Sequence, residues 1–486
     1  MAEESLKEKT AKGLFWGGLS NGIQQLLNLF FGVFLARLLT PADYGMVGML
    51  TIFSLIATTL QESGFTAALA NKKEIKYEDY NSVFWFSILT SLCIYIVLYF
   101  FAPLIAKFFN QPQLIPLARY SFLCIVISST GIAQNAYMFC NLMVKQKAIS
   151  VIIGLFISGI VGIILAYYGF SYWGIVTQNI TYVSVVMICY WLFSPWRPTF
   201  NLNFSPLKEM LAFSCKILTT NIFIHLNNNI FSIILGKFYT EKEVGFYNQA
   251  NKWNYMGFSL INGMINGVAQ PILAQVSETK ERQLFVFRKM MKFTSFFSFP
   301  CMLGLSLIAP ELISIAITDK WLTSVQLLQL LSLYGAFIPI VSLCTNLIIS
   351  KGKSNIFMWN TIIQGAIQLL VLYTIYPYGI QIMIITYVII NILWLFIWQY
   401  FVWEEINYRF VHFLADVLPF FFASIAIMGA TYFFTRPITN IYILFASKII
   451  VAATLYIFIM WLSKCETFKE STTFIKSKIK KHSTQL

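Results

Sequence analysis

Charged residues are scarce in this chain of 486 residues, since only 11% are Asp, Glu, Lys or Arg. Soluble domains carry about a quarter. Apolar residues make up 58% of the chain, and the mean hydropathy is +0.70. Such a composition excludes an ordinary soluble enzyme, and it is too apolar for a disordered chain. The sequence therefore predicts a polytopic membrane protein.

Residues that carry catalysis and metal binding are also few. The three histidines and eight cysteines show no metal-ligand or redox spacing. Gly352-Lys353-Ser354 resembles the end of a phosphate-binding loop, but Leu347 stands where the first glycine would have to be. We predict no enzyme activity, no metal and no cofactor. The net charge of +14 is assigned to cytoplasmic loops, and no nucleic-acid partner is expected.

Long apolar runs are what the chain has in abundance. A helix needs roughly 20 such residues to cross a bilayer. The runs are continuous, whereas strands of a barrel would alternate, so the spans are predicted to be helices. The predicted fold class is all-α, with about 14 transmembrane helices. They lie at 12–37, 44–66, 81–102, 114–139, 148–168, 172–193, 210–236, 245–276, 292–316, 322–349, 355–376, 380–403, 412–434 and 440–463.

The basic residues predict the orientation, because loops rich in Lys and Arg stay in the cytoplasm. With the N-terminus inside, 24 of the 34 Lys and Arg fall on the cytoplasmic side and 7 on the other. This asymmetry predicts an even number of spans and two cytoplasmic termini. Lys448 lies within the last span without a polar stripe around it, and it is expected to snorkel to the membrane surface.

An internal repeat divides the chain. A shift of 200 residues places 21–45 on 221–245 with seven identities and no gap. The identities include Asn28 on Asn228, Thr40 on Thr240 and Gly45 on Gly245. The first and seventh spans would then be equivalent and share one orientation. That arrangement is a parallel repeat, for which a substrate is expected between the halves.

Polar side chains recur at helical spacing within four predicted spans, although they are costly in lipid. The candidates for a hydrophilic cavity are Asn21, Gln25 and Asn28 in the first span, Asn221, His225 and Asn228 in the seventh, and Asn248, Lys252, Tyr255, Ser259, Asn262 and Asn266 in the eighth. The second span carries Thr51, Ser54, Thr58 and Glu62. Either these faces line a shared cavity, or they form hydrogen bonds between packed helices.

Several charged or titratable residues lie on or near these faces, and some of them have two interpretations. Lys252 either faces an anionic ligand or snorkels to the membrane surface. His225 either relays protons or makes a helix contact. Glu62, Lys216 and Arg37 are candidate charge partners, although Arg37 at the end of its span also suits an interfacial anchor.

Several motifs give the chain a family resemblance. They are Ala36-Arg-Leu-Leu-Thr-Pro-Ala-Asp-Tyr-Gly45, Glu62-Ser-Gly-Phe-Thr-Ala-Ala-Leu69, Leu235-Gly-Lys-Phe238, Val244-Gly-Phe-Tyr-Asn-Gln-Ala-Asn-Lys252 and, more weakly, Gly352-Lys-Ser. In order and spacing they resemble the bacterial polysaccharide transporter family of lipid-linked oligosaccharide flippases, of the O-antigen and exopolysaccharide type. This family belongs to the multidrug/oligosaccharidyl-lipid/polysaccharide exporter superfamily. The resemblance covers essentially the whole chain.

The resemblance implies two pseudo-symmetric six-helix lobes, at 1–200 and 201–405, around a central cavity with alternating access. Two extra transmembrane helices at 406–465 and a basic cytoplasmic tail at 466–486 would follow. The implied substrate is an oligosaccharide on a polyprenyl diphosphate, which a basic residue at the position of Lys252 would contact. The implied location is the bacterial inner membrane, with membrane lipids and the glycan polymerase machinery as further partners.

Two other functions compete with this interpretation. A drug/cation antiporter of the same superfamily favours an embedded carboxylate in the first lobe. The first span has none, and Lys252 would repel a cation. A membrane glycan polymerase or ligase needs catalytic residues on a sizeable outer loop, and the predicted outer loops are short and contain no histidine.

Overall fold

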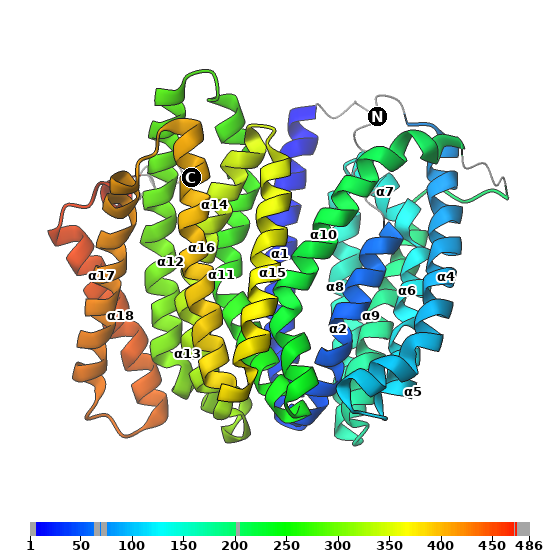
Figure 1. The fold of residues 1–486 in the computed structure, drawn as a ribbon, viewed down its shortest axis with the longest axis horizontal. Helices are drawn as coiled ribbons and strands as arrows, with labels where there is room; N and C mark the ends of the chain where they lie inside the picture. Colours follow the sequence, from blue (N-terminus) through cyan, green and yellow to red (C-terminus); the bar gives the residue numbers. More distant parts are fainter. Residues whose placement is uncertain (1–5, 63–68, 70–74, 201–204, 471, 474–486) are drawn as a thin grey trace, which may run out of the picture. The chain divides into compact units, whose positions relative to one another are not determined.

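The computed structural model describes residues 6–62, 69, 75–200, 205–470 and 472–473 (Figure 1). Every regular element among these residues is a helix. The contacts divide the chain into two compact units, Met1–Asn248 and Gln249–Leu486.

The first unit is a bundle of long helices with three consecutive short helices in the middle of its sequence. Its helices are α1 (Leu6–Leu38), α2 (Pro41–Glu62), α4 (Tyr77–Phe109), α5 (Leu114–Ser121), α6 (Leu123–Ser129), α7 (Ile132–Cys140), α8 (Val144–Tyr167), α9 (Ser171–Phe193), α10 (Ser205–Phe238) and the beginning of α11 (Glu241–Gln275). Helix α8 packs along both α9 and α1, and α10 packs against α2 and α4.

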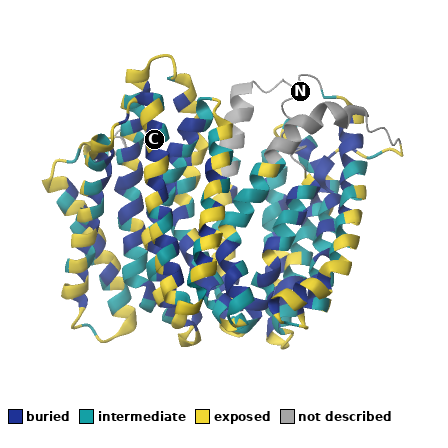
Figure 2. Cartoon of the chain, viewed as in Figure 1, coloured by how far each residue is buried: buried dark blue, intermediate teal, exposed yellow. Residues whose placement is uncertain are grey.

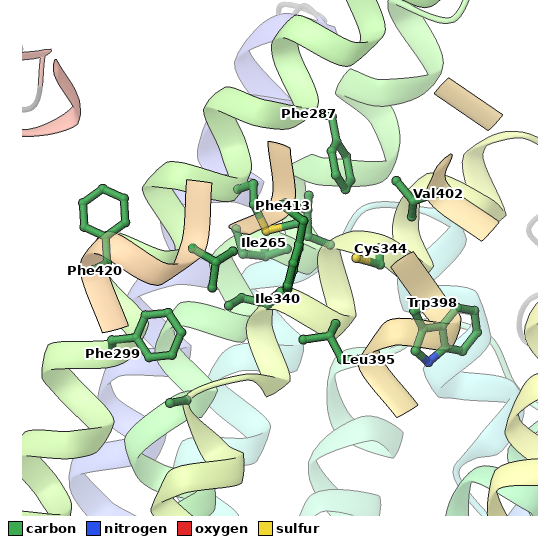
Figure 3. Close-up of a cluster of buried hydrophobic side chains, with 14 of the residues drawn as sticks. Ile265, Phe287, Phe299, Ile340, Cys344, Leu395, Trp398, Val402, Phe413 and Phe420 are labelled. Carbon is green, nitrogen blue, oxygen red and sulfur yellow. The ribbon is translucent and has the colours of Figure 1, made fainter. Parts of the chain in front are cut away.

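The second unit is organised around α12 (Lys280–Ile317), which packs against most of its neighbours. Besides the rest of α11, its helices are η1 (Asp319–Trp321), α13 (Thr323–Gly335), α14 (Ile338–Ser350), α15 (Ser354–Ile375), η2 (Tyr376–Tyr378), α16 (Ile380–Ile406), α17 (Phe410–Thr435) and α18 (Ile441–Leu462). A hydrophobic core joins α11, α12, α14, α16 and α17. Figure 3 shows Phe287, Cys344, Trp398 and Phe413 within it.

Among the described residues, eleven helices are long and apolar enough to cross a membrane, and the bent pair 114–129 and 132–140 would make a twelfth. The chain is thus a multi-pass membrane protein. Helices α10 and α11 are as long but carry more polar residues, and they are not among these eleven. They occupy the seventh and eighth of the fourteen predicted spans. The exact count of fourteen is consistent with this architecture and stays a prediction.

Two predicted spans are interrupted in the structure. The fourth, predicted at 114–139, consists of α5, α6 and α7, with a bend of 44° before α7. The tenth, predicted at 322–349, is divided into α13 and α14 around residues 336–337, before Pro339 in the first turn of α14. Hydropathy over a window of residues does not reveal such breaks, because the apolar composition continues through them.

Helices α17 and α18 each bury a single stripe. In α18 the buried residues are Lys448, Ala452, Tyr456 and Met460, which recur every four residues. Much of the remaining surface of both helices is exposed, as the yellow segments of Figure 2 show. The large side chains exposed there are apolar, among them Phe422, Phe433, Ile450 and Phe458. Such a surface is expected to face lipid, because water would not solvate it.

Candidate functional site: polar faces of the long helices

The polar face of α1 is open to its surroundings. Asn21 and Asn28 are exposed, and Gln25 is half-buried. Another side of the helix packs on α8, where the rings of Phe31 and Phe156 lie 6.2 Å apart. The amides of Asn21 and Asn28 are therefore accessible to a ligand.

The matching face of α10 is partly satisfied within the protein. Asn221 and His225 are half-buried and Asn228 is exposed. Near the end of the helix, the Ser232 hydroxyl donates a hydrogen bond to Asn248 Oδ1 over 3.1 Å. The face thus continues from α10 into the beginning of α11.

On the polar face of α11, some side chains form hydrogen bonds within the protein and others do not. Ser259 donates to the carbonyl of Met256 over 3.2 Å, and Asn266 Oδ1 accepts from Asn346 Nδ2 over 2.9 Å. These two side chains therefore make contacts within and between helices. Tyr255 is exposed, and Lys252 is half-buried.

Two asparagines of this face keep an unused polar atom. Asn248 Nδ2 and Asn262 Oδ1 are buried and have no hydrogen-bond partner among the described residues. A buried amide without a partner is costly. These two atoms are therefore left unsatisfied by the helix packing around them.

The charged candidates differ in surroundings. Glu62 ends α2, is exposed, and interacts electrostatically with Lys147 of α8. Arg37 is exposed at the end of α1. Lys216 lies in α10, but its side chain is outside the described part of the structure. Lys252 forms no ion pair within the described residues. In the same part of the chain, no group of three or more His, Cys, Asp or Glu side chains could hold a metal ion.

Two hydroxyl groups of the polar stripe of α2 donate hydrogen bonds to the backbone of their own helix. Thr51 donates to the carbonyl of Val47 over 3.2 Å, and Thr58 donates to that of Ser54 over 3.0 Å. Threonine commonly satisfies its hydroxyl in this way within helices.

The repeat detected at a shift of 200 residues reappears as two matching helix caps. Before α2, the backbone and hydroxyl of Thr40 donate to Asp43 Oδ2 over 2.8 and 2.7 Å. Before α11, Thr240 donates in the same way to Glu243 Oε2 over 2.9 and 3.0 Å. Each is a capping box, in which a threonine and an acidic residue satisfy the first turn together.

Two glycines at the same shift bring these helix beginnings into contact. A methyl group on Gly45 would overlap the backbone carbonyl of Glu241, and one on Gly245 would overlap that of Pro41. Residues 41 and 45 are also the repeat equivalents of 241 and 245. The contact is therefore reciprocal, and only glycine allows the backbones to approach so closely. We call this contact the glycine junction.

Lys448 does not snorkel, which corrects the expectation from the sequence. Its Nζ lies 2.6 Å from Glu311 Oε1 of α12 and donates to the carbonyl of Leu307 over 3.2 Å. The two charged side chains are 6% and 7% exposed. A lysine buried beside a carboxylate has no need to reach the membrane surface.

A second ion-pair network joins α12 to the start of α17. Arg288 donates Nε and Nη2 to the two oxygens of Asp416 over 2.8 and 2.9 Å. The Tyr408 hydroxyl donates to Asp416 Oδ2 over 3.2 Å. Burial, and secondarily the charge of Asp416, raises the pKa of Tyr408, so the phenol keeps its proton and remains a donor. The sequence offered no sign of this network, because its partners are 128 residues apart.

Comparison with known proteins places the chain in a family. A family model described as "Polysaccharide biosynthesis protein" matches residues 34–326, more than half of the chain. An uncharacterized membrane protein in the cps region of Klebsiella pneumoniae is 26% identical, with 76% of this chain and 77% of that protein covered. A teichuronic acid biosynthesis protein of Bacillus subtilis (strain 168) is 23% identical over 74% of each chain.

A solved structure shares the fold. It is a lipid II flippase in an inward closed conformation, with a TM-score of 0.73, 16% identity, and coverage of 96% of this chain and 100% of that one. The fold likeness extends over both compact units.

Proposed function

Because the chain belongs to the polysaccharide biosynthesis protein family, we propose that it is a flippase for surface polysaccharide biosynthesis. It moves an oligosaccharide carried on a polyprenyl diphosphate from the inner to the outer leaflet of the bacterial inner membrane. The family match carries this proposal, and it includes both copies of the repeat around residues 34–45 and 234–245. No bond is made or broken in this process.

The polar faces of α1, α10 and α11 suit such a substrate. A diphosphate and several sugars cannot cross hydrocarbon without replacing their hydration. Asn28, Asn228 and Asn262 offer amides for the sugar hydroxyls, while Lys252 offers an ammonium for the diphosphate. The apolar tail remains in the lipid throughout.

Alternating access requires that the two ends of the path open in turn. We assign the glycine junction to the end that opens when the substrate leaves. Its reciprocal backbone contact is close, and α2 and α10 also pack on each other beside it, so the helix beginnings are able to separate only as part of that packing gives way. The capping boxes keep each first turn intact as they do so.

Topology and partners follow from the same proposal. Both termini lie in the cytoplasm, on the side of the basic loops. The two lobes comprise 1–200 and 201–405, followed by the helix pair within 406–465 and the basic tail at 466–486. The compact units instead divide after Asn248, because α10 packs on α2 and α4. The polymerase machinery would receive the flipped unit.

Analysis of lipid-linked oligosaccharides in a deletion strain tests the function. Loss of surface glycan, with lipid-linked repeat units trapped on the inner leaflet, is the expected result. A plasmid copy of the gene restores export, whereas a Lys252→Ala copy restores little. Single units accumulating on the outer leaflet would instead indicate a missing polymerase or ligase and would overturn the proposal.

A further inference from the structure

A cavity of about 570 Å³ lies within the first unit, where the α7–α8 corner meets α1. Its size is within the range of small-molecule sites, roughly 300 to 1,000 Å³. The polar lining comes from Ser20, Asn21 and Gln24 of α1 and from Lys147 of α8. Apolar side chains, among them Phe139 of α7, form the rest of its wall. A charged group beside apolar walls suits an amphiphile.

Two ammonium groups lie at this corner without ion-pair partners in the described part of the chain. Lys147 Nζ lies 5.2 Å from the centre of the Phe139 ring, and Lys145 Nζ lies 5.2 Å from that of Trp16. An aromatic ring attracts a cation but does not neutralise it. Glu62 is the acidic group that acts on Lys147, and it does not line the cavity. Among the described residues, the two lysines outnumber this one carboxylate, so the corner carries a net positive charge.

We propose that this cavity is a binding site for the phosphate groups of a polyprenyl-linked substrate, with Lys147 as the cationic contact. The inference rests on the proposed function and adds a second site to it. Lys147 contacts the phosphate, Ser20 and Gln24 contribute hydrogen bonds, and the apolar wall accommodates the first part of the tail. Both classes of interaction are needed to hold an anionic lipid.

The position of Asn21 connects this site to the proposed path. Asn21 lines the cavity and also begins the polar face of α1 that continues through Gln25 and Asn28. A headgroup bound at Lys147 therefore lies at one end of that face. The site holds the substrate before the headgroup moves along α1.

Cys140 provides a native probe because it lines the same cavity. The full-length protein in lipid nanodiscs is treated with a maleimide, and modification of Cys140 is followed by peptide-resolved mass spectrometry. Polyprenyl diphosphate is expected to slow this modification about fivefold, as occupancy of a site blocks a reagent. Phosphatidylglycerol, added at equal charge, is expected to protect much less.

Variants separate the cavity lysine from its neighbour. Lys147→Gln is expected to weaken protection by polyprenyl diphosphate about tenfold, since a hydrogen bond to a charged group is lost. Lys147→Arg keeps the charge and most of the protection. Lys145→Gln is the matched control, because Lys145 does not line the cavity. The labelling rate without lipid reports whether each variant keeps the fold around Cys140.

Three results would overturn the inference: no protection by polyprenyl diphosphate in the native protein, unchanged protection in Lys147→Gln, or equal protection by phosphatidylglycerol. None of them contradicts the flippase proposal, which is measured by export in cells. Conversely, a chain that binds the lipid at Cys140 but whose deletion leaves export intact would refute the flippase function and leave the binding site standing.

Discussion

At the scale of single residues, two lysines within long helices differ in their surroundings. Lys448 is buried against the carboxylate of Glu311 and a backbone carbonyl, and these partners satisfy its charge. Lys252 is half-buried and forms no ion pair within the described chain. The first lysine therefore holds α18 to α12, and the second is free to meet an anion.

Lys252→Ala is expected to reduce export about tenfold, because the ammonium that we propose as the contact for the diphosphate is lost. Export is measured as surface glycan at matched protein level in a deletion strain. Lys242→Ala is the control, because Lys242 is exposed and lies outside the polar face. Export at the native level in Lys252→Ala would remove this lysine from the mechanism.

Lys448→Met is expected to destabilise the protein by about 3 to 5 kcal/mol, because the Glu311 carboxylate is left buried and alone. Thermal unfolding in detergent measures the effect as a lower Tm. The double variant Lys448→Met, Glu311→Leu should recover most of the loss.

The pair of Lys289 and Glu470, exposed on both sides, serves as a comparison for this test. Lys289→Met should leave Tm almost unchanged, since exposed ion pairs contribute little. A Tm for Lys448→Met equal to that of the native protein would show that the buried pair has no structural role.

At the scale of elements, the beginnings of α2 and α11 depend on two glycines. Gly45→Ala is expected to hold the glycine junction apart, because the added methyl overlaps the carbonyl of Glu241. Export should fall several-fold at normal expression. Cysteines introduced beside the glycine junction should also react faster with a membrane-impermeant thiol reagent than they do in the protein with Gly45.

Gly22→Ala is the matched control for this substitution, since a methyl there meets no other atom within 4 Å. It should leave both export and thiol reactivity unchanged. If Gly45→Ala behaves like Gly22→Ala, the junction does not regulate access.

Elements were predictable to different degrees for physical reasons. Apolar runs predicted long spans such as α8 and α16 to within a few residues, because burial in lipid demands them. The repeat between 21–45 and 221–245 predicted equivalent helix ends, and the two capping boxes match it. The breaks between α5, α6 and α7 depend on local packing, which leaves no mark on hydropathy.

At the scale of the whole molecule, the polar faces predict that water reaches one side of helices that otherwise lie in the membrane. Cysteines placed at Asn28, Asn228 and Asn262 are expected to react with a membrane-impermeant thiol reagent in at least one conformational state. A cysteine at Ile450 is the control, because that residue is 62% exposed on an apolar face of α18 and should be shielded by lipid. Protection of all three asparagine positions in every state would mean that these faces are packing surfaces.

The sequence predicted candidate site residues better than their partners. Helical spacing was enough to group Asn21, Gln25 and Asn28 on one face, because the period of a helix is fixed. It did not reveal the cavity at Lys147, whose wall combines α1 with a corner more than a hundred residues later. It also missed Glu311 as the partner of Lys448, 137 residues away. Long-range pairs depend on packing that no local pattern records.

The same pair constrains how the chain is synthesised. The ribosome produces α12 before α18, so the carboxylate of Glu311 enters the membrane while Lys448 has yet to be translated. A lone charged residue costs about 2.5 to 3.5 kcal/mol at translocon-mediated insertion. The last helix supplies the countercharge, and a nascent chain stopped before α18 retains an uncompensated acid.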